Sequence, residues 1–294
     1  MTRALVLGGG GPVGIAWESG LLAGLAQAGV DLGRADFIMG TSAGSFVGAR
    51  LALGAETAKL AEPILADAAR PPRPSNGGGR PAADLSKLMQ LMAEAQGGLR
   101  NPAEVRRDIG AYALAAQTMD EQAFIDTFGR SFASLPPDAW PERGFACTAV
   151  NAQDGAFKFW TKDSGVGVTR AVASSCSVPG IYPPVTIDGK RYIDGGMRSS
   201  TNADLAAGHD LVVVVAVRLA GADERSARLA ARLDDEINQL KDGGSTVVVV
   251  SPDDGSLAAM GANLMDFARR ADAARAGLAQ GAREATDLAG LWAG

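Results

Sequence analysis

One serine stands in a pattern that is typical of a catalytic nucleophile. Ser42 lies in the pentapeptide Gly40–Gly44, after a short apolar run, Phe37–Met39, and before a segment of helical character, Phe46–Leu53. A strand, then Gly-x-Ser-x-Gly, then a helix is the order of a nucleophile elbow, whose sharp turn exposes the serine hydroxyl. Gly40 and Gly44 lack Cβ atoms, so the two arms of the turn can approach each other. The alternative is an ordinary strand-to-helix turn in which Ser42 caps the helix.

Two residues compete for the role of base. The chain has a single histidine, His209, in a turn-like tetrapeptide before an apolar run, where a surface or capping role is the simpler interpretation. Asp194 ends a β-like run and precedes Gly195 and Gly196, which permit close approach of the backbone. It is the better candidate, although an Asp-Gly pair also occurs in plain turns. An aspartate is a weak base at its ordinary pKa of about 3.9, so we expect burial to raise the pKa of Asp194.

A glycine-rich loop follows the first apolar run. Gly9, Gly11 and Gly14 form a G-x-G-x-x-G pattern between a strand at 3–8 and a helix at 15–28. Such loops direct backbone N–H groups toward a negative charge, either a dinucleotide pyrophosphate or the oxyanion of an acyl-transfer intermediate. A dinucleotide site places an acidic residue at the end of the second strand, whereas Asp36 lies at its start. This order favours the oxyanion, although a simple tight turn would also explain the glycines.

Alternating strands and helices must position these residues. The pattern predicts an α/β fold, with a mostly parallel central sheet flanked by helices. The expected strands are 3–8, 37–39, 145–150, 156–160, 185–187, 191–193, 211–217 and 246–250, and the expected helices of the sheet layers are 15–28, 46–53, 169–174 and 223–240.

We interpret residues 1–294 as one α/β domain with two additions. Residues 70–135 form a helical insertion or cap, which opens with a Pro- and Gly-rich loop at 70–81 and continues with helices at 84–95, 102–115 and 120–134. Residues 257–291 form an Ala-rich, helical C-terminal tail. The helix at 84–95 carries an apolar stripe that could face acyl chains but more often belongs to a core, namely Leu85, Leu88, Met89 and Met92.

Composition excludes several classes of function. The net charge is −5, from 28 basic and 33 acidic residues, so no basic footprint for nucleic acid exists. The apolar run 211–217 is far too short to span a bilayer. The two cysteines, Cys147 and Cys176, have no disulfide or metal-ligand spacing. We therefore expect a cytoplasmic protein without a metal or a cofactor.

The motifs together resemble those of bacterial patatin-like phospholipases. Gly9–Gly14 is similar to the family's oxyanion loop, Gly40–Gly44 to its elbow, and Asp194–Gly196 to its Asp-Gly-Gly/Ala motif. The lead-in Ala173–Val185 is also similar, and the resemblance spans about residues 3–218, with a weak middle at 60–140. One position departs from the pattern: Val13 stands where the family usually has Arg or Lys, which puts binding of an anionic head group in doubt.

The resemblance implies a three-layer sandwich and a Ser-Asp dyad that hydrolyses acyl esters of lipids. Ser42 would be the nucleophile, Asp194 its base, and the N–H groups of Gly9, Gly10 and Gly11 the oxyanion donors. The remaining motif glycines would support these residues, namely Gly14, Gly40, Gly44, Gly195 and Gly196. A lipid or acyl-ester substrate implies transient, peripheral contact with a membrane surface. Two alternatives stay open, a nucleotide- or dinucleotide-binding protein that uses only the glycine loop, and a catalytically silent scaffold of the same fold.

Overall fold

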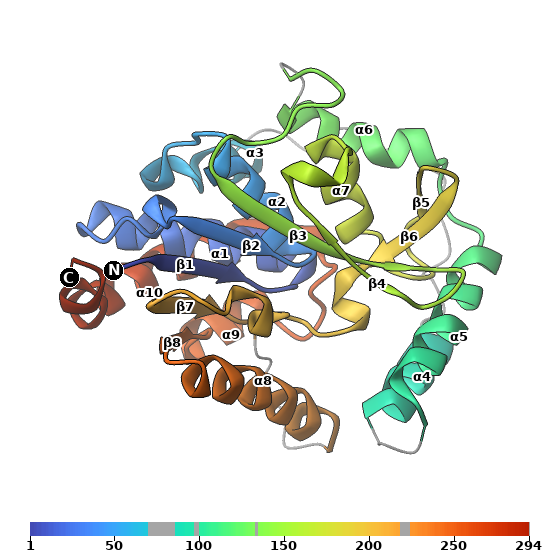
Figure 1. Ribbon diagram of the computed structural model, residues 1–294. Coiled ribbons are helices and arrows are strands. Elements are labelled where there is room, and N and C mark those ends of the chain that lie inside the picture. The colour runs from blue at the N-terminus through green and yellow to red at the C-terminus, as the bar shows by residue number, and fades with distance from the viewer. Residues whose placement is uncertain (70–85, 97–99, 133–134, 218–223, 294) are drawn as a thin grey trace.

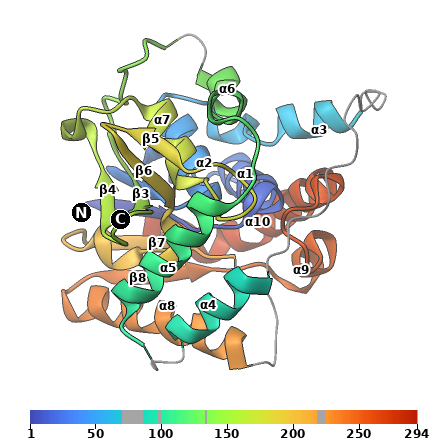
Figure 2. The ribbon, with the colours of Figure 1, turned by 90° about the vertical axis from the view of Figure 1, so that its right-hand side faces the viewer.

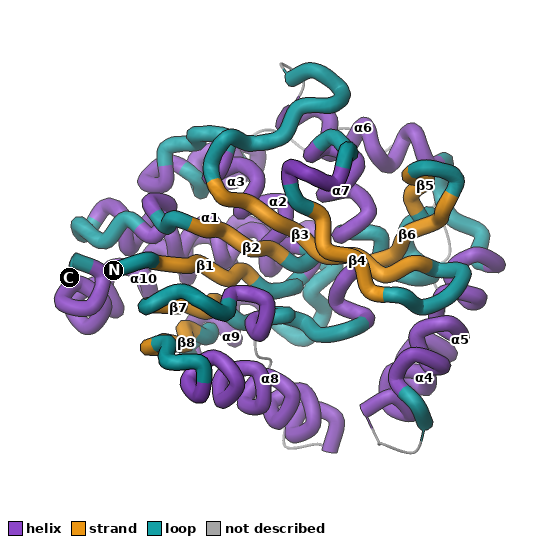
Figure 3. The backbone as a smooth tube through the Cα atoms, in the orientation of Figure 1, coloured by secondary structure: helices purple, strands orange, loops and turns teal. Residues whose placement is uncertain are grey.

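In the described residues, eight strands form one mixed sheet (Figures 1 and 3). A computed structural model describes residues 1–69, 86–96, 100–132, 135–217 and 224–293. The strand order is β5-β6-β3-β2-β1-β7-β8, and β4 pairs with β3 outside this order. The parallel strands are β1 (Arg3–Leu7), β2 (Phe37–Gly40), β3 (Gly144–Asn151), β7 (Leu211–Val215) and β8 (Thr246–Val250). The antiparallel strands are β4 (Phe157–Trp160), β5 (Val185–Ile187) and β6 (Lys190–Asp194).

The central strands are buried on both faces. All five residues of β7 are buried, and β1 is buried after Arg3. Parallel strands read as unbroken apolar runs because helices must cover both faces of their sheet. The expected three-layer α/β arrangement is therefore confirmed, with β4, β5 and β6 as an antiparallel extension at one side.

Helices cover the two faces unequally. One face packs against α1 (Gly11–Gln27), α2 (Ala43–Ala52), α7 (Val168–Ser175) and α10 (Arg270–Trp292). The other face packs against α8 (Glu224–Asp242) and the short turn η5 (Ala203–Ala206). Figure 1 shows α1 and α2 behind the sheet and α8 below it. The two termini lie together, and the guanidinium of Arg3 donates to the carbonyl of Trp292 at 2.7 Å.

Four helices follow α2 and precede β3, namely α3 (Glu62–Ala68), α4 (Ser86–Gln96), α5 (Pro102–Ala115) and α6 (Glu121–Phe132). Of these, α4 and α5 lie together at the side of the sheet that carries β4 and β6, α6 packs near α7, and α3 packs near α10 (Figure 2). The expected loop at 70–81 lies outside the described residues, as does Leu85 of the apolar stripe. Leu88 of that stripe is buried in a small core with α5, whereas the side chains of Met89 and Met92 are not described. The division into a domain, an insertion and a tail stays an interpretation.

The C-terminal segment packs into the core layer through glycines. It contains α9 (Asp254–Met260) and α10, which a loop at 261–266 and a short turn, Phe267–Arg269, separate, so the expected helical segment at 257–291 consists of more than one helix. Gly20 and Gly24 of α1 lie against the backbone of Ala274 and Leu278 of α10, where a Cβ atom would collide. The small residues let the two helix backbones approach closely, and this contact holds α1 against the sheet.

Candidate active site

Strand β3 brings the ends of two other strands together. Gly40, the last residue of β2, lies opposite Cys147 of β3, and Asp194, the last residue of β6, lies opposite Ala149. Because strand residues rise about 3.3 Å each, these two ends are about 7 Å apart along β3. Ser42 follows Gly40 by two residues. The nucleophile candidate and the base candidate therefore meet at the carboxyl edge of the parallel strands.

Ser42 has the backbone conformation expected of an elbow. Its φ is 53° and its ψ is −117°, a region that residues with a Cβ atom rarely adopt. Its N–H donates to the hydroxyl of Ser175 at 3.0 Å, and its carbonyl accepts from the hydroxyl of Ser45 at 2.6 Å and the thiol of Cys176 at 3.1 Å. Strain of this kind persists only where surrounding contacts fix it, and it concentrates at functional sites.

The glycines of the elbow are required by crowding. A Cβ atom on Gly44 would collide with the carbonyl group of Leu7, at the end of β1. A Cβ atom on Gly40 would collide with the backbone of Gly44 and Ser45 across the turn. The expectation that Gly40 and Gly44 permit close approach of the two arms is therefore confirmed in atomic detail.

Asp194 is a buried carboxyl group that accepts two hydrogen bonds. Its side chain accepts the N–H of Gly196 at 2.7 Å, and the residue is only 3% exposed. Burial raises the pKa of Asp194 from 3.8 to about 7, although hydrogen bonds from the Ser42 hydroxyl and the Gly196 N–H lower it. Gly195 packs so tightly on Thr148 of β3 that a Cβ atom would collide with it. Desolvation thus gives this aspartate a proton affinity suited to a base at neutral pH.

The glycine-rich loop differs in one respect from the expectation. The N–H of Gly9 donates to the carbonyl of Ser200 at 2.7 Å, so the prediction of Gly9 as an oxyanion donor is wrong in this conformation. In the described part of the chain, the N–H groups of Gly10 and Gly11 have no acceptor. Helix α1 begins at Gly11 rather than at residue 15, so these N–H groups stand at its N-terminus. Their role as oxyanion donors stays a prediction.

Two further positions of the loop face inward. Gly14 lies over the elbow, where an added Cβ atom would be 3.6 Å from the Cβ atom of Ala43. Val13 is fully buried, and its N–H donates to the carbonyl of Leu264 at 3.1 Å. The valine therefore belongs to the core and presents no side chain to solvent at this position.

His209 lies at the opposite edge of the sheet from Ser42. It precedes β7 by two residues, and β7 starts opposite Arg3, the first residue of β1. Its ring stacks on Phe37 at 5.3 Å, and Nδ1 lies 2.9 Å from the carbonyl of Ala206. Asp36 lies at the same edge, where its carboxylate accepts the N–H of Arg3 at 2.7 Å. Neither residue can reach Ser42 across a strand that is about 15 Å long.

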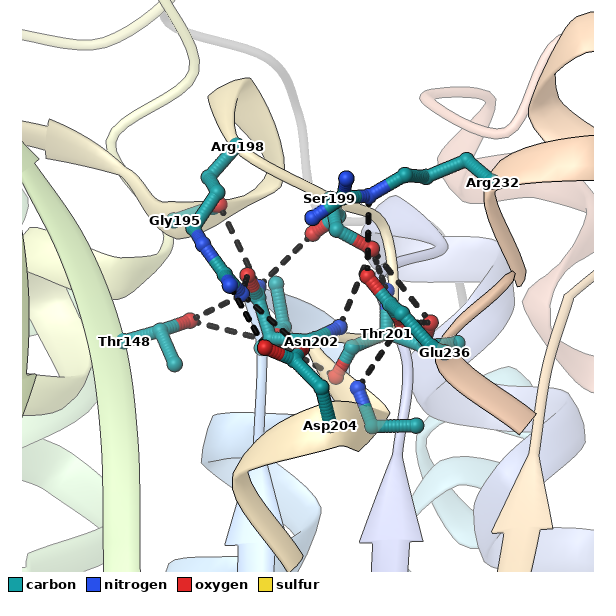
Figure 4. A network of polar contacts seen from close by, with 11 residues as sticks. Thr148, Gly195, Arg198, Ser199, Thr201, Asn202, Asp204, Arg232 and Glu236 are labelled. Atoms are coloured by element: carbon teal, nitrogen blue, oxygen red, sulfur yellow. Dashed lines mark hydrogen bonds and ion pairs between the residues drawn. The ribbon is translucent and has the colours of Figure 1, made fainter. Parts of the chain in front are cut away.

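The sequence patterns did not identify the residues that hold the elbow, the glycine-rich loop and the Asp194 segment in place. Ser175 holds the elbow, Ser200 holds Gly9, and Asn202 lies in a buried polar network beside Gly195 (Figure 4). Ser175 lies in the lead-in Ala173–Val185, but no local pattern shows what any of the three contacts, because each acts on a segment that is distant in the sequence. Asn202 alone carries a weak signal, since asparagine tolerates the left-handed conformation that it adopts here, with φ 51°.

A family model for patatin-like phospholipases matches residues 5–207. The chain belongs to the patatin-like phospholipase family. The match contains the glycine-rich loop, the elbow and the Asp-Gly-Gly motif, and it confirms the family that the motifs suggested. The curated relatives described below are fungal, so a bacterial origin is not shown.

Several known proteins are similar to this patatin-like chain over part of their length. Lysophospholipase nte1 of Aspergillus fumigatus is 28% identical over 227 residues, which are 76% of this chain and 12% of that protein. Lysophospholipase nte1 of Aspergillus niger is likewise 28% identical over 229 residues. The chain thus spans about an eighth of these relatives. VipD from Legionella pneumophila has 14% identity and a TM-score of 0.47, over 97% of this chain and 67% of VipD.

The described residues contain no cluster of three or more His, Cys, Asp or Glu side chains that could hold a metal ion. Within the same ranges, no helix combines the length and the apolar character that crossing a bilayer requires.

Proposed function

We propose that this patatin-like chain is a serine acyl hydrolase of the phospholipase A type, with Ser42 as nucleophile and Asp194 as base. One observation carries the proposal: a serine in a strained elbow conformation hydrogen-bonds to a buried aspartate, and the only histidine lies at the other edge of the sheet. Membership of a phospholipase family supports a lipid ester as the substrate.

The reaction would proceed through an acyl-enzyme. The Ser42 oxygen attacks the ester carbonyl carbon while its proton passes to the Asp194 carboxylate. The N–H groups of Gly10 and Gly11 stabilise the oxyanion, and the departing alcohol takes the proton from Asp194 as the C–O bond breaks. Water then attacks the acyl carbon and gives its proton to Asp194. The bond between the acyl carbon and the Ser42 oxygen breaks, and this oxygen takes the proton from Asp194, which releases the fatty acid and restores the Ser42 hydroxyl.

The oxyanion donors must provide much of the rate. An aspartate accepts a proton less readily than an imidazole, even with its pKa raised to about 7. One oxyanion donor contributes on the order of 3 kcal/mol of transition-state stabilisation in well-studied enzymes. The N-terminus of α2, which begins at Ala43 directly after the nucleophile, adds favourable electrostatics to the developing negative charge.

The alternative of a nucleotide site has less support. Leu264 and Met265 lie against Gly11, where an added Cβ atom would be 2.8 Å from the Leu264 carbonyl oxygen and 2.9 Å from the Met265 sulfur. A pyrophosphate would need that space above the loop. Asp36, the acidic residue such a site would use, lies at the far edge of the sheet. Thermal shifts with millimolar NAD or ATP test this alternative, and we expect none.

The proposal is tested with p-nitrophenyl esters from acetate to palmitate. We expect turnover by the wild type, and its loss in both Ser42→Ala and Asp194→Asn, with melting curves showing that both variants fold. The chain length that turns over fastest then reports the depth of the acyl site. Turnover that persists in Ser42→Ala would overturn the proposal, and a folded wild type without turnover on esters or on dispersed lysophospholipid would favour the silent scaffold.

We also propose that substrate delivery involves transient contact with a lipid surface. A lipid ester in an aggregate must leave that aggregate to reach a buried elbow, and Ser42 is only 7% exposed. A cytoplasmic location stays a prediction from the cysteine content.

A further inference from the structure

A buried polar network lies beside the proposed dyad, on the side of the sheet that α8 covers (Figure 4). Its centre is Asn202, which is fully buried and has φ 51°. The side chain contacts Thr41, one residue before Ser42, and the carbonyl of Gly195, one residue after Asp194. A single side chain thus contacts both segments that carry the proposed catalytic groups.

The orientation of the Asn202 amide follows from its partners. The guanidinium of Arg198 donates to Oδ1 at 2.8 Å, so this atom must be the oxygen. Nδ2 then faces acceptors only, with the carbonyl of Ser199 at 2.7 Å and the hydroxyl oxygen of Thr41 at 3.0 Å. The Gly195 carbonyl at 3.4 Å is a longer contact of the same nitrogen. Because an amide nitrogen carries two hydrogens, the first two contacts are its principal bonds.

The Thr41 hydroxyl connects the Asn202 side chain to the centre of the sheet. While it accepts from Asn202, its oxygen lies 3.0 Å from the hydroxyl of Thr148, between the residues of β3 that pair with β2 and β6. The N–H of Thr41 donates to the Leu7 carbonyl, at the end of β1. Thr41 is therefore fixed from three sides, and Ser42 is the next residue.

The same segment holds the glycine-rich loop and is itself anchored. The carbonyl of Ser200, two residues before Asn202, accepts the N–H of Gly9. Glu236 of α8 accepts the hydroxyl of Thr201 at 2.7 Å and the N–H of Ala203 at 2.9 Å. Glu236 is fully buried and pairs with Arg232 at 3.2 Å. Residues 199–203 thus join the oxyanion loop, the elbow and the Asp194 segment to an outer helix.

We propose that Asn202 is a positioning residue for the hydrolase reaction and that it acts through Thr41 on Ser42. The inference rests on the proposed function and adds a residue to it. Asn202 forms no hydrogen bond with Ser42 or Asp194, so its effect is on their relative placement. A displacement of about 1 Å in reacting groups can reduce a rate about 100-fold.

The test compares four substitutions with wild type and Ser42→Ala. Asn202→Asp preserves the shape, the acceptor for Arg198 and tolerance of a positive φ, but it replaces the donor to Thr41 by an oxygen. Thr41→Val removes the Thr41 hydroxyl, whereas Thr41→Ser keeps a hydroxyl at this position. Gln280→Met is the matched control, because Gln280 is another buried amide, on α10, which accepts from Trp17 at 3.1 Å and Ser256 at 2.7 Å.

We expect kcat on p-nitrophenyl butyrate to fall about 10- to 100-fold in Asn202→Asp and Thr41→Val, with KM changed less than about threefold. Thr41→Ser is expected to retain most of the wild-type kcat. Gln280→Met is expected to lower the melting temperature and leave kcat unchanged. Melting curves show whether each variant folds. If Asn202→Asp does not fold, the comparison of Thr41→Val with Thr41→Ser tests the positioning role.

Two outcomes would overturn the inference, and they are distinguishable. If Asn202→Asp and Thr41→Val fold and keep the wild-type kcat, Asn202 has a structural role only, while the proposed function stands. If the wild type shows no turnover that Ser42→Ala abolishes, the proposed function fails and the positioning role fails with it.

Discussion

The thiol of Cys176 donates to the backbone carbonyl of Ser42 at 3.1 Å. This cysteine follows α7 directly, and its sulfur also lies 3.6 Å from the hydroxyl of Ser45. The thiol therefore lies beneath the elbow and helps to fix a strained residue. Burial raises the pKa of the Cys176 thiol, and the nearby carboxylate of Asp194 raises it further.

We expect neither cysteine to react in the folded protein. Burial raises the pKa of Cys147 as well, and only the thiolate is strongly nucleophilic. Iodoacetamide should leave both thiols unmodified and the esterase activity intact under native conditions, while both thiols should react in guanidinium chloride. Intact mass spectrometry gives the count. Rapid native alkylation of Cys176 would show that the contact with Ser42 opens readily in solution.

Gly44→Ala should prevent a stable elbow from forming. Its Cβ atom would collide with the backbone of Leu7, so we expect a loss of about 2 kcal/mol or more in the free energy of unfolding, together with loss of activity. Gly129→Ala is the control, because Gly129 lies in α6 with open space at its Cβ position. That change should stabilise the protein by about 0.5–1 kcal/mol. Urea unfolding measures both, and equal stability of the two variants would contradict the crowding argument.

The dependence of activity on pH should follow Asp194. Ionised Asp194 accepts the Ser42 proton, so kcat/KM should be low in acid and rise to a plateau as the carboxyl group loses its proton. The midpoint is expected near the raised pKa of Asp194, about 7. Rates on p-nitrophenyl butyrate between about pH 5 and about pH 9 give the profile. A profile that is already flat above about pH 5, as a carboxyl group with the ordinary pKa of about 3.9 would give, would contradict a buried Asp194 as base.

Glu18 is expected to destabilise the protein as the pH rises. Both oxygens of its fully buried side chain have no hydrogen-bond partner in the described residues, and burial raises its pKa well above 4.5. The native state therefore favours the protonated form, and stability is lost as the pH rises through the native pKa. Glu18→Met should raise the melting temperature, and more at pH 9 than at pH 6, whereas the exposed Glu62→Met should not. Destabilisation at every pH would indicate a partner for Glu18.

Local sequence patterns were sufficient to predict most of the strands and helices and to single out Ser42 and Asp194 as candidates. β8 at Thr246–Val250 and α5 at Pro102–Ala115 have the predicted bounds, because an unbroken apolar run and a proline at the first helical position are strong local signals. Ser42 and Asp194 could be proposed as candidates for the same reason, since neighbouring glycines mark the turns that carry them.

Contacts between distant segments could not be predicted in this way. Gly9 belongs to the glycine pattern, yet its N–H is occupied by Ser200, about 190 residues later, and nothing near either residue indicates that bond. The contact of α1 with α10, in contrast, has a signal in the sequence of each helix. Both helices carry two glycines four residues apart, Gly20 and Gly24 on α1 and Gly277 and Gly281 on α10, a spacing that places them on one helix face.

Labelling with a fluorophosphonate tests the central claim most directly, because this probe bonds covalently to an activated serine. The wild type should gain one phosphonyl group on the peptide that contains Ser42, while Ser42→Ala gains none and Asp194→Asn reacts far more slowly. Peptide mass spectrometry locates the adduct. A folded wild type that stays unlabelled at Ser42, or one that Asp194→Asn matches in rate, would contradict the dyad.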